Sequence, residues 1–432
     1  MLLRSRRVIL PDGERPAALR IAGGRIADVL DYGITSLPTE DVVDVGGCVL
    51  MPGLVDSHVH INEPGRTEWE GLATASRAAL VGGVTTLVDM PLNCSPATTC
   101  LAALEAKREH FFGRSAINVQ FWAGVVRGNS GEIAAMLDAG ALGAKCFLTP
   151  SGIDDFPHSE VEDLRRAMPE LARRGKPLLV HAELDVPRSS PGNRRSHAEW
   201  VVSRPPECEV RAVRLMIDLC REFGTHVHIV HVAAEEVLPL IRAARAEGLP
   251  ISAETCPHYL LLASEEVPDG ATEFKCAPPI REAWHREALW SALRDGTLDM
   301  IVSDHSPCLP SMKERDSGDF FSAWGGIASL QFGLPLIWNE ASRRGLSLAD
   351  VVRWMALAPA RLAGLEGHKG ALVAGADADV VALDPDSTWS IREDLIEHRH
   401  KLTPYLGRHA RGEVCRVWIA GREVGRGAVC PR

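Results

Sequence analysis

Residues 55–65 read Val-Asp-Ser-His-Val-His-Ile-Asn-Glu-Pro-Gly and place two histidines, His58 and His60, at the end of an apolar run. Side chains two positions apart on a strand lie on the same face, so both imidazoles can reach one metal ion. An isolated His-x-His is more often a polar strand end than a pair of ligands. The interpretation therefore depends on what other strand ends supply.

The middle of the chain alternates between apolar segments and helical patterns. The predicted strands are 53–61, 84–90, 119–126, 144–148, 177–181, 226–232, 251–255 and 299–303, and the clearest predicted helices are 67–82, 159–175, 207–223 and 235–248. Alternating strands and helices in this number predict an α/β fold of the (β/α)8 TIM barrel type over residues 51–369. A doubly wound open sheet is the rival, but it gives no reason for eight units.

Both ends of the chain have a different character. Short strand patterns joined by Gly- and Asp-rich turns fill the first 50 residues and recur near residues 379–383 and 416–420. We therefore expect residues 1–50 and 370–432 to form one composite β-sandwich domain beside the barrel.

Composition restricts the class of protein. The chain has 432 residues, 46% of them hydrophobic, and a net charge of −10 without a basic cluster, so neither a nucleic-acid partner nor an anionic membrane is expected. Eleven cysteines without a Cys-x-x-Cys pair indicate reduced thiols. No apolar run approaches the roughly 20 residues that span a bilayer, and no signal peptide is evident. These features predict a cytoplasmic protein.

In a barrel, reactive groups come from the carboxyl ends of the strands. Reading only those positions adds four candidates to His58 and His60. The six predicted metal ligands are His58, His60, Lys145, His181, His231 and Asp304. Because other strand ends supply further ligand candidates, we predict that His58 and His60 are a metal-binding pair.

Two choices within this set need an argument. His226, His228 and His231 share one predicted strand, and only His231 lies at its end, so we take His231 as the ligand. Asp56 lies one step deeper than His58 on the same face, where its carboxylate could orient an imidazole.

Lys145 and Asp304 have plain alternatives. A buried ammonium beside metal ions is costly, and a lysine paired with a carboxylate is the simpler interpretation. A neutral amine can instead react with carbon dioxide, and the resulting carbamate could bridge two cations. Asp304 could cap a turn, or it could bind metal and accept a proton from water activated by the ion.

The motifs along the chain resemble those of the cyclic amidohydrolases in the amidohydrolase superfamily. The shared stretches include PGLVDSHVH (52–60), GAKCFL (143–148), LVHAE (179–183), ETCPHYL (254–260) and VSDHSPC (302–308). EPGR-x-x-W-E-G (63–71), MPLN (90–93), WGGI-x-x-LQ (324–331) and RHK-x-TPY-x-G (399–407) are narrower and resemble the allantoinases most.

The resemblance implies hydrolytic ring opening of allantoin to allantoate in purine catabolism. His58 and His60 would bind one divalent ion, and His181 and His231 the second. Carboxylated Lys145 would bridge the two ions, and Asp304 would be both ligand and proton carrier. Zinc suits these ligands, and Co²⁺, Mn²⁺ or Fe²⁺ also fit. The resemblance further implies a homotetramer or homodimer, with substrate contacts from Ser306, Asn62 and Asn93.

Three alternatives stay open. A hydantoinase or dihydropyrimidinase of broad specificity needs the same metals. A dihydroorotase binds the carboxylate of its substrate with an arginine two residues after the second histidine, where this chain has the uncharged Asn62. A non-catalytic oligomeric scaffold would have lost ligands, and none is missing. One departure from relatives is Ala233-Ala234, where two serines commonly follow the histidine.

Overall fold

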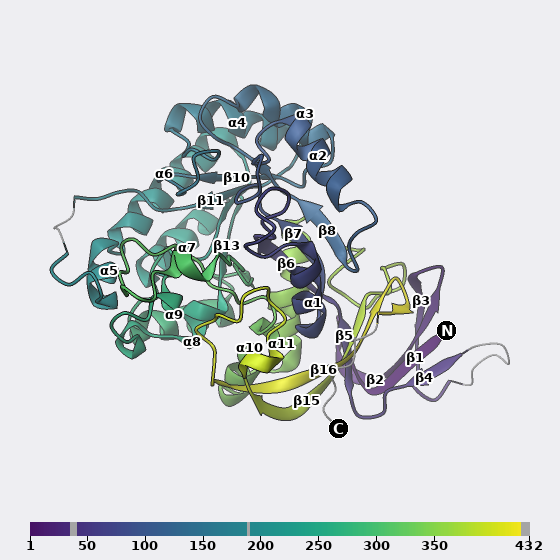
Figure 1. The fold of residues 1–432 in the computed structure, drawn as a ribbon. Coiled ribbons are helices and arrows are strands. Elements are labelled where there is room, and N and C mark those ends of the chain that lie inside the picture. Colours follow the sequence, from purple (N-terminus) through teal and green to yellow (C-terminus); the bar gives the residue numbers. More distant parts are fainter. Residues whose placement is uncertain (35–40, 188–190, 425–432) are drawn as a thin grey trace.

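The computed structural model describes residues 1–34, 41–187 and 191–424. Within these residues the centre of the molecule is a closed ring of short parallel strands surrounded by helices (Figure 1). The ring strands are β6 (Leu54–Val59), β7 (Val84–Asp89), β8 (Asn118–Phe121), β9 (Ala123–Gly124), β10 (Ala144–Phe147), β11 (Leu178–His181), β12 (Val227–Ile229), β13 (Ile251–Thr255) and β14 (Met300–Ile301).

Hydrogen bonds close this ring. Strands β6 to β8 form one parallel sheet and β9 to β14 another, and the chain passes between the two sheets at Trp122. At the other junction, Val59 forms a parallel bridge with His305, and the backbone N–H of His60 donates to the carbonyl of His305 at 2.8 Å. The first and last strands are therefore neighbours, which confirms the predicted (β/α)8 barrel and excludes an open sheet.

The predicted third strand, 119–126, is interrupted. Trp122 separates β8 from β9, and its fully buried indole donates a hydrogen bond to the carbonyl of Ser57 inside the ring. Residues 121–126 are buried on both sides of the break and are mostly apolar, so the sequence gives no sign of it.

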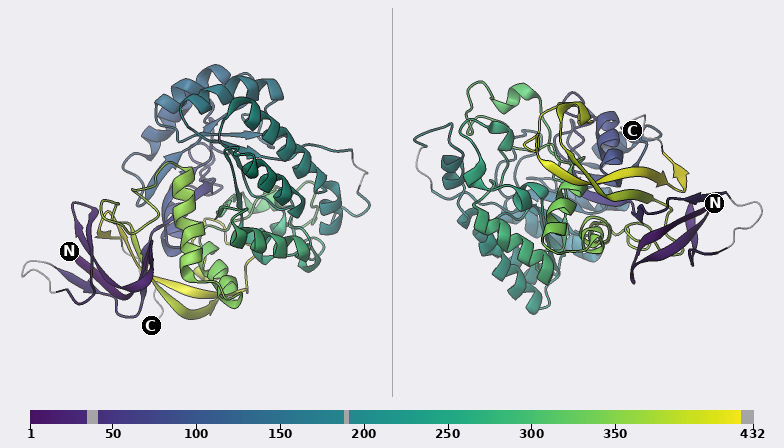
Figure 2. Two further views of the ribbon diagram at one scale, coloured as in Figure 1. Left: turned by 180° about the vertical axis from the view of Figure 1, so that it is seen from behind. Right: turned by 90° about the horizontal axis from the view of Figure 1, so that it is seen from below.

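Helices cover the outside of the ring (Figure 2). The predicted helix 207–223 is α6, which ends at the left-handed Gly224, as a glycine C-cap favours. The other helices are α1 (Leu72–Val81), α2 (Leu101–Phe111), α3 (Ile133–Asp138), α4 (Val161–Arg173), α5 (His197–Ser203), α7 (Leu238–Ala246), α8 (Pro257–Leu261), α9 (Ala283–Asp295), α10 (Gly333–Arg343), α11 (Leu348–Val352) and α12 (Ala358–Leu362), and a π-helical turn, Arg353–Leu357, joins the last two.

Strands from both chain ends form a second sheet beside the barrel (Figures 1 and 2). They are β1 (Leu2–Leu10), β2 (Gly13–Ala22), β3 (Arg25–Leu30), β4 (Val42–Asp44), β5 (Val49–Pro52), β15 (Val380–Ser390), β16 (His409–Ile419) and β17 (Arg422–Glu423). The small β domain shared by both ends is thus confirmed. Its division into 1–50 with 370–432, against 51–369 for the barrel, stays a prediction, and residues 425–432 lie outside the described residues.

Strand β15 shows how this sheet stays attached to the barrel. Val380 and Ala382 belong to a small apolar core within the terminal domain, whereas Val381 and Leu383 belong to the large core of the barrel. Because side chains alternate across a strand, one sheet serves two cores.

The terminal sheet also runs directly into the barrel. Strand β5 pairs with β1 and β15, and only Gly53 separates it from β6. The backbone N–H of Gly53 donates to the carbonyl of Asp379 at 2.9 Å. A Cβ atom at Gly53 would lie 2.1 Å from Oγ1 of Thr85, so this junction has room for glycine alone.

Candidate metal centre

The six predicted ligands lie together at the carboxyl ends of the ring strands. His58 is on β6, Lys145 on β10, and His181 is the last residue of β11. His60, His231 and Asp304 follow β6, β12 and β14. All six residues are buried, and none is more than 8% exposed. Closure of the barrel therefore gathers residues that are far apart in the sequence.

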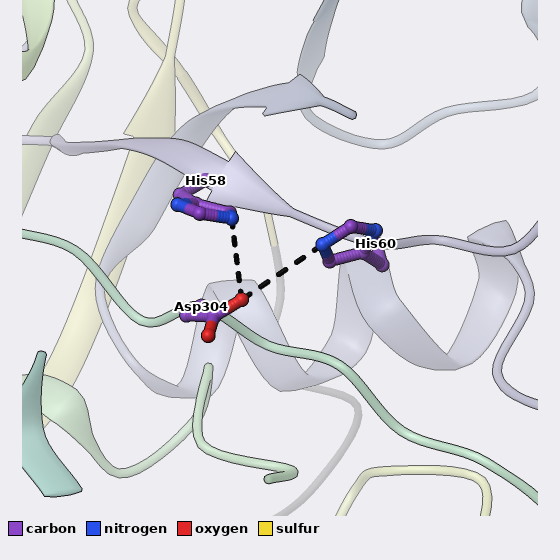
Figure 3. A group of neighbouring side chains, drawn as sticks. All are labelled: His58, His60 and Asp304. Carbon is purple, nitrogen blue, oxygen red and sulfur yellow. Dashed lines mark ion pairs between the residues drawn. The ribbon is translucent and has the colours of Figure 1, made fainter. Parts of the chain in front are cut away.

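His58 and His60 point toward the carboxylate of Asp304 (Figure 3). Oδ1 of Asp304 lies 3.2 Å from Nε2 of His58 and 3.8 Å from Nε2 of His60. These three residues offer ligand atoms that all lie within 4.8 Å of one another. Burial raises the pKa of Asp304 and lowers that of His60. Neutral imidazoles with a carboxylate form a donor set suited to a divalent ion.

His181 and His231 form the second pair. Nδ1 of His181 lies 3.0 Å from Nε2 of His231, and the Nε2 of His181 lies 2.9 Å from Oε2 of Glu183. This network assigns the proton of His181 to Nε2, so its Nδ1 lone pair faces His231. Burial lowers the pKa of His231 and lowers that of His181 to about 4. Both rings are thus neutral and available as ligands at neutral pH.

Among the described residues, the amine of Lys145 has no hydrogen-bond partner, although Lys145 is 1% exposed and its amine lies 5.3 Å above the Phe147 ring. The simpler interpretation, a lysine paired with a carboxylate, is therefore not what the side chain shows. Burial lowers its pKa from 10.5 to about 8. An unsatisfied, weakly basic amine among four imidazoles fits a residue whose final chemical form carries a further group.

The backbone at this centre is strained. His231 and Asp304 have φ values of 40° and 43°, and Asn62 and Asn93 have 65° and 64°. Positive φ suits asparagine better than most residues and is unfavourable for histidine. Strain of this kind is typical of residues that a site holds in a required orientation.

Two buried glutamates orient the ligands, and neither was predicted. Oε1 of Glu254, on β13, accepts from Nδ1 of His58 at 2.5 Å, and Glu183 accepts from His181. Both carboxylates are at most 1% exposed. The expectation that Asp56 orients an imidazole is wrong. Its carboxylate accepts the backbone N–H groups of His58 and Ser303 at 3.2 Å instead, and burial raises its pKa to about 6.

The centre opens into a cavity of about 270 Å³. Its wall includes both histidine pairs, Asp304 and two of the predicted substrate contacts, Asn93 and Ser306. Arg204 and Lys275 add cationic groups, and Trp200 and Trp324 add apolar area. Asn62 is absent from this wall, because its side chain is turned to donate to the carbonyl of Pro307 at 3.1 Å.

The two alanines that follow His231 do not leave the backbone unsatisfied. Oε2 of Glu209 accepts from the N–H groups of Ala233 and Ala234, each at 3.1 Å. Arg281 pairs with the other oxygen of Glu209 and holds it in place. A carboxylate from α6 therefore supplies the hydrogen bonds that serine hydroxyls could have made.

Comparison with known proteins agrees with this geometry. The family model described as the amidohydrolase family matches residues 49–424. The chain belongs to the amidohydrolase family.

Among its relatives is the allantoinase of Streptomyces avermitilis, which is 47% identical over 98% of this chain and 95% of the relative. The allantoinase of Arabidopsis thaliana is 40% identical over 98% of this chain and 87% of its own length. The L-hydantoinase (dihydropyrimidinase) of Arthrobacter aurescens has a similar structure, with a TM-score of 0.91 and 29% identity over 98% of this chain and 95% of the other. The predicted resemblance to allantoinases and the prediction of a cyclic amidohydrolase are confirmed.

The family and the buried His and Asp residues indicate a divalent metal site. Within residues 1–34, 41–187 and 191–424, no helix is both long and apolar enough to cross a membrane.

Proposed function

We propose that this protein opens the hydantoin ring of allantoin by hydrolysis and releases allantoate. The observation that carries the proposal is the convergence of two buried histidine pairs and Asp304 on one cavity, with the buried Lys145 amine beside the cavity residue Phe147, in a chain 47% identical to an allantoinase. Every ligand type that the proposal needs is present at the carboxyl end of the barrel.

Two divalent ions, with zinc as the first candidate, would be held by His58 and His60 and by His181 and His231. Lys145 would bridge them after carboxylation of its amine. When bound, such ions lower the pKa of water and polarise a carbonyl group. The unsatisfied Lys145 amine and the facing nitrogens of His181 and His231 fit this arrangement.

The chain's own residues account for the remaining chemistry. Asp304 lies beside both His58 and His60, where its carboxylate can accept a proton from water and return it to the leaving ring nitrogen. Asn93 and Ser306 line the cavity and can hold the amide groups of the ring. Phe147 stacks on His181, with ring centroids 4.4 Å apart, and limits its rotation.

The cavity wall supports allantoin more than hydantoins with apolar substituents. Arg204 and Lys275 lie in the wall, and Lys275 is 5% exposed with its amine 4.4 Å above the Trp200 ring. Lys275 donates to backbone carbonyls of Phe321 and Ala323, and Arg204 pairs with Glu183. Their remaining N–H groups favour a ligand with further carbonyl oxygens, such as a ureido group. Broad hydantoinase activity is the second candidate, and the L-hydantoinase neighbour favours it.

A substrate panel on one metal-quantified sample tests the proposal. We expect allantoin to be hydrolysed with a kcat/KM at least about tenfold above those of 5-alkyl hydantoins, dihydrouracil and dihydroorotate, since one recognised polar group is worth at least this much. Ready hydrolysis of alkyl hydantoins with allantoin left intact would assign the protein to the second candidate.

We further propose a cytoplasmic homotetramer or homodimer. Buried thiols such as Cys146 and Cys256 are free, which supports a reducing compartment. Light scattering at two protein concentrations would determine the oligomeric state.

A further inference from the structure

Each histidine pair lies against a buried carboxylate. The two carboxylates differ in whether a neighbouring cation balances their negative charge. Glu254 accepts from Nδ1 of His58, and Glu183 accepts from Nε2 of His181. Each contact fixes the tautomer of one imidazole, so that its other nitrogen faces the metal centre. The two arrangements look equivalent until the remaining partners of each glutamate are compared.

The negative charge of Glu183 is matched by a guanidinium. Nε of Arg204 lies 3.0 Å from Oε1 of Glu183, and Nη2 lies 2.7 Å from Oε2. This bidentate pair is held in low-dielectric surroundings, since the Arg204 side chain is 15% exposed and that of Glu183 is 1% exposed. The carboxylate beside His181 therefore adds orientation and almost no net charge.

Among the described residues, Glu254 is paired with imidazoles and not with a guanidinium or an amine. Its Oε2 lies 2.9 Å from Nε2 of His228, whose Nδ1 lies 2.7 Å from Oγ of Ser252. The same Oγ lies 2.7 Å from Nε2 of His226. Hydrogen bonds along this chain can run from His226 through Ser252 and His228 to Glu254. In the part of the chain that the structure describes, no lysine or arginine forms an ion pair with Glu254.

Two further charges bear on the comparison. Asp304 lies 3.2 Å from His58 and adds a second carboxylate to the first position. Lys145 lies near both positions, since its charge acts on His60, His181 and His231 and also on Glu254 and Asp304. Among the described residues its amine forms no ion pair with Glu254, and in the proposed carboxylated form it would bring no positive charge to either position.

We propose that the two metal positions differ in affinity because of Arg204. The position at His58, His60 and Asp304 keeps the full charge of Glu254 and binds a divalent ion tightly. The position at His181 and His231 has its carboxylate neutralised and releases its ion first. This inference rests on the metal-binding part of the proposed function and is independent of the substrate.

A zinc titration tests the difference directly. The full-length protein is loaded with Zn²⁺ and competed against a chromogenic chelator, and bound zinc is counted by elemental analysis. We expect two steps separated by at least about tenfold in Kd, the scale on which buried partners of metal ligands act. The variant His231→Asn should keep the tight step, and His60→Asn should keep only the weak one.

Two substitutions that break the same ion pair provide the decisive comparison. Arg204→Met leaves an unneutralised carboxylate beside His181, so the weak step should tighten toward the strong one. Glu183→Gln leaves an unneutralised guanidinium there, so the weak step should weaken further. Glu254→Gln should weaken the strong step by about 10- to 100-fold. Structural damage alone would move Arg204→Met and Glu183→Gln in the same direction.

Each outcome decides the inference. Indistinguishable steps in the wild-type protein, or equal weakening in Arg204→Met and Glu183→Gln, would overturn it. Absence of zinc binding in the wild-type protein would overturn both this inference and the proposed metal chemistry. Because the readout is bound zinc, a protein that binds two ions but ignores allantoin would refute only the proposed substrate.

Discussion

Oδ1 of Asp304 lies 3.2 Å from Nε2 of His58. His58 lies on the first strand of the barrel, whereas Asp304 follows the last strand. They meet because Val59 and His305 form the bridge that closes the ring. Formation of the metal centre and closure of the barrel are therefore the same structural event.

Asp304→Asn should abolish catalysis with limited loss of metal. Asparagine tolerates the positive φ of this position, so the backbone should keep its shape, but an amide cannot accept the proton that the carboxylate accepts. We expect kcat to fall by about 10²- to 10⁴-fold, the usual contribution of general acid–base catalysis. Steady-state kinetics with zinc quantified on the same sample would measure this. A kcat within tenfold of wild type would contradict the role of Asp304.

Lys145→Ala should remove both activity and bound metal. The substitution deletes the group that would bridge the two ions, and we expect a loss of more than about 100-fold in kcat/KM. Formate or propionate should restore part of the activity if they can occupy the place of the carbamate. Lys176→Ala, a half-buried lysine away from the centre, is the matched control. Near-normal activity of Lys145→Ala would exclude the bridging role.

Lys107→Met should destabilise the fold. Nζ of Lys107 lies 2.5 Å from Oδ2 of Asp89, and both side chains are 1% exposed. Leaving Asp89 buried without its partner should lower the free energy of unfolding by about 3–5 kcal/mol. Urea denaturation would measure the loss. The double variant Lys107→Met with Asp89→Asn should recover part of it, and equal losses in the single and double variants would argue against a charge effect.

Glu70 should contribute to stability in a pH-dependent way. Burial alone would raise its pKa, but the neighbouring His305 imidazole, whose Nε2 lies 3.5 Å from Oε2 of Glu70, lowers the pKa from 4.5 to about 2. A lowered pKa stabilises the folded state above about pH 4.5, and this contribution disappears as the pH falls toward 2. The shift corresponds to about 3 kcal/mol at neutral pH.

Glu70→Gln should therefore unfold more easily at pH 7 and show a shallower loss of stability between about pH 5 and 2. Urea titrations across this range would measure both effects. Glu68→Gln, an exposed glutamate two residues away, is the control and should leave the profile unchanged. A pH profile of Glu70→Gln parallel to that of wild type would refute the assignment.

Much of the fold follows from periodicity in the sequence. The apolar strands alternate with amphipathic helices, and α6 begins and ends where its pattern predicts. The break at Trp122 could not be predicted, because it depends on the Trp122 indole reaching the carbonyl of Ser57 across the ring. A contact between distant parts of the chain leaves no trace in local periodicity.

The metal ligands could be predicted because strand ends are recognisable, but their supporting residues were missed. Ser252 and Glu254 alternate within β13 and so share one face of a largely buried strand, which is the signal that was available. The sequence predicts that Asp56 contacts a histidine ring, because alternation along a strand shows on which face a side chain lies. Alternation does not show which group the side chain contacts on that face. The positive φ values of His231 and Asp304 depend on the assembled centre.

The junction at Gly53 has a consequence for work with altered chains. Strand β6, which carries His58, begins one residue after β5. Strand β5 is hydrogen-bonded to β1 on one side and to β15 on the other. The terminal domain thus fixes the position of the strand that carries the first metal ligand. A truncation, tag or fusion that disturbs either end of the chain would lower the retention of divalent metal, even though the altered residues lie outside the barrel.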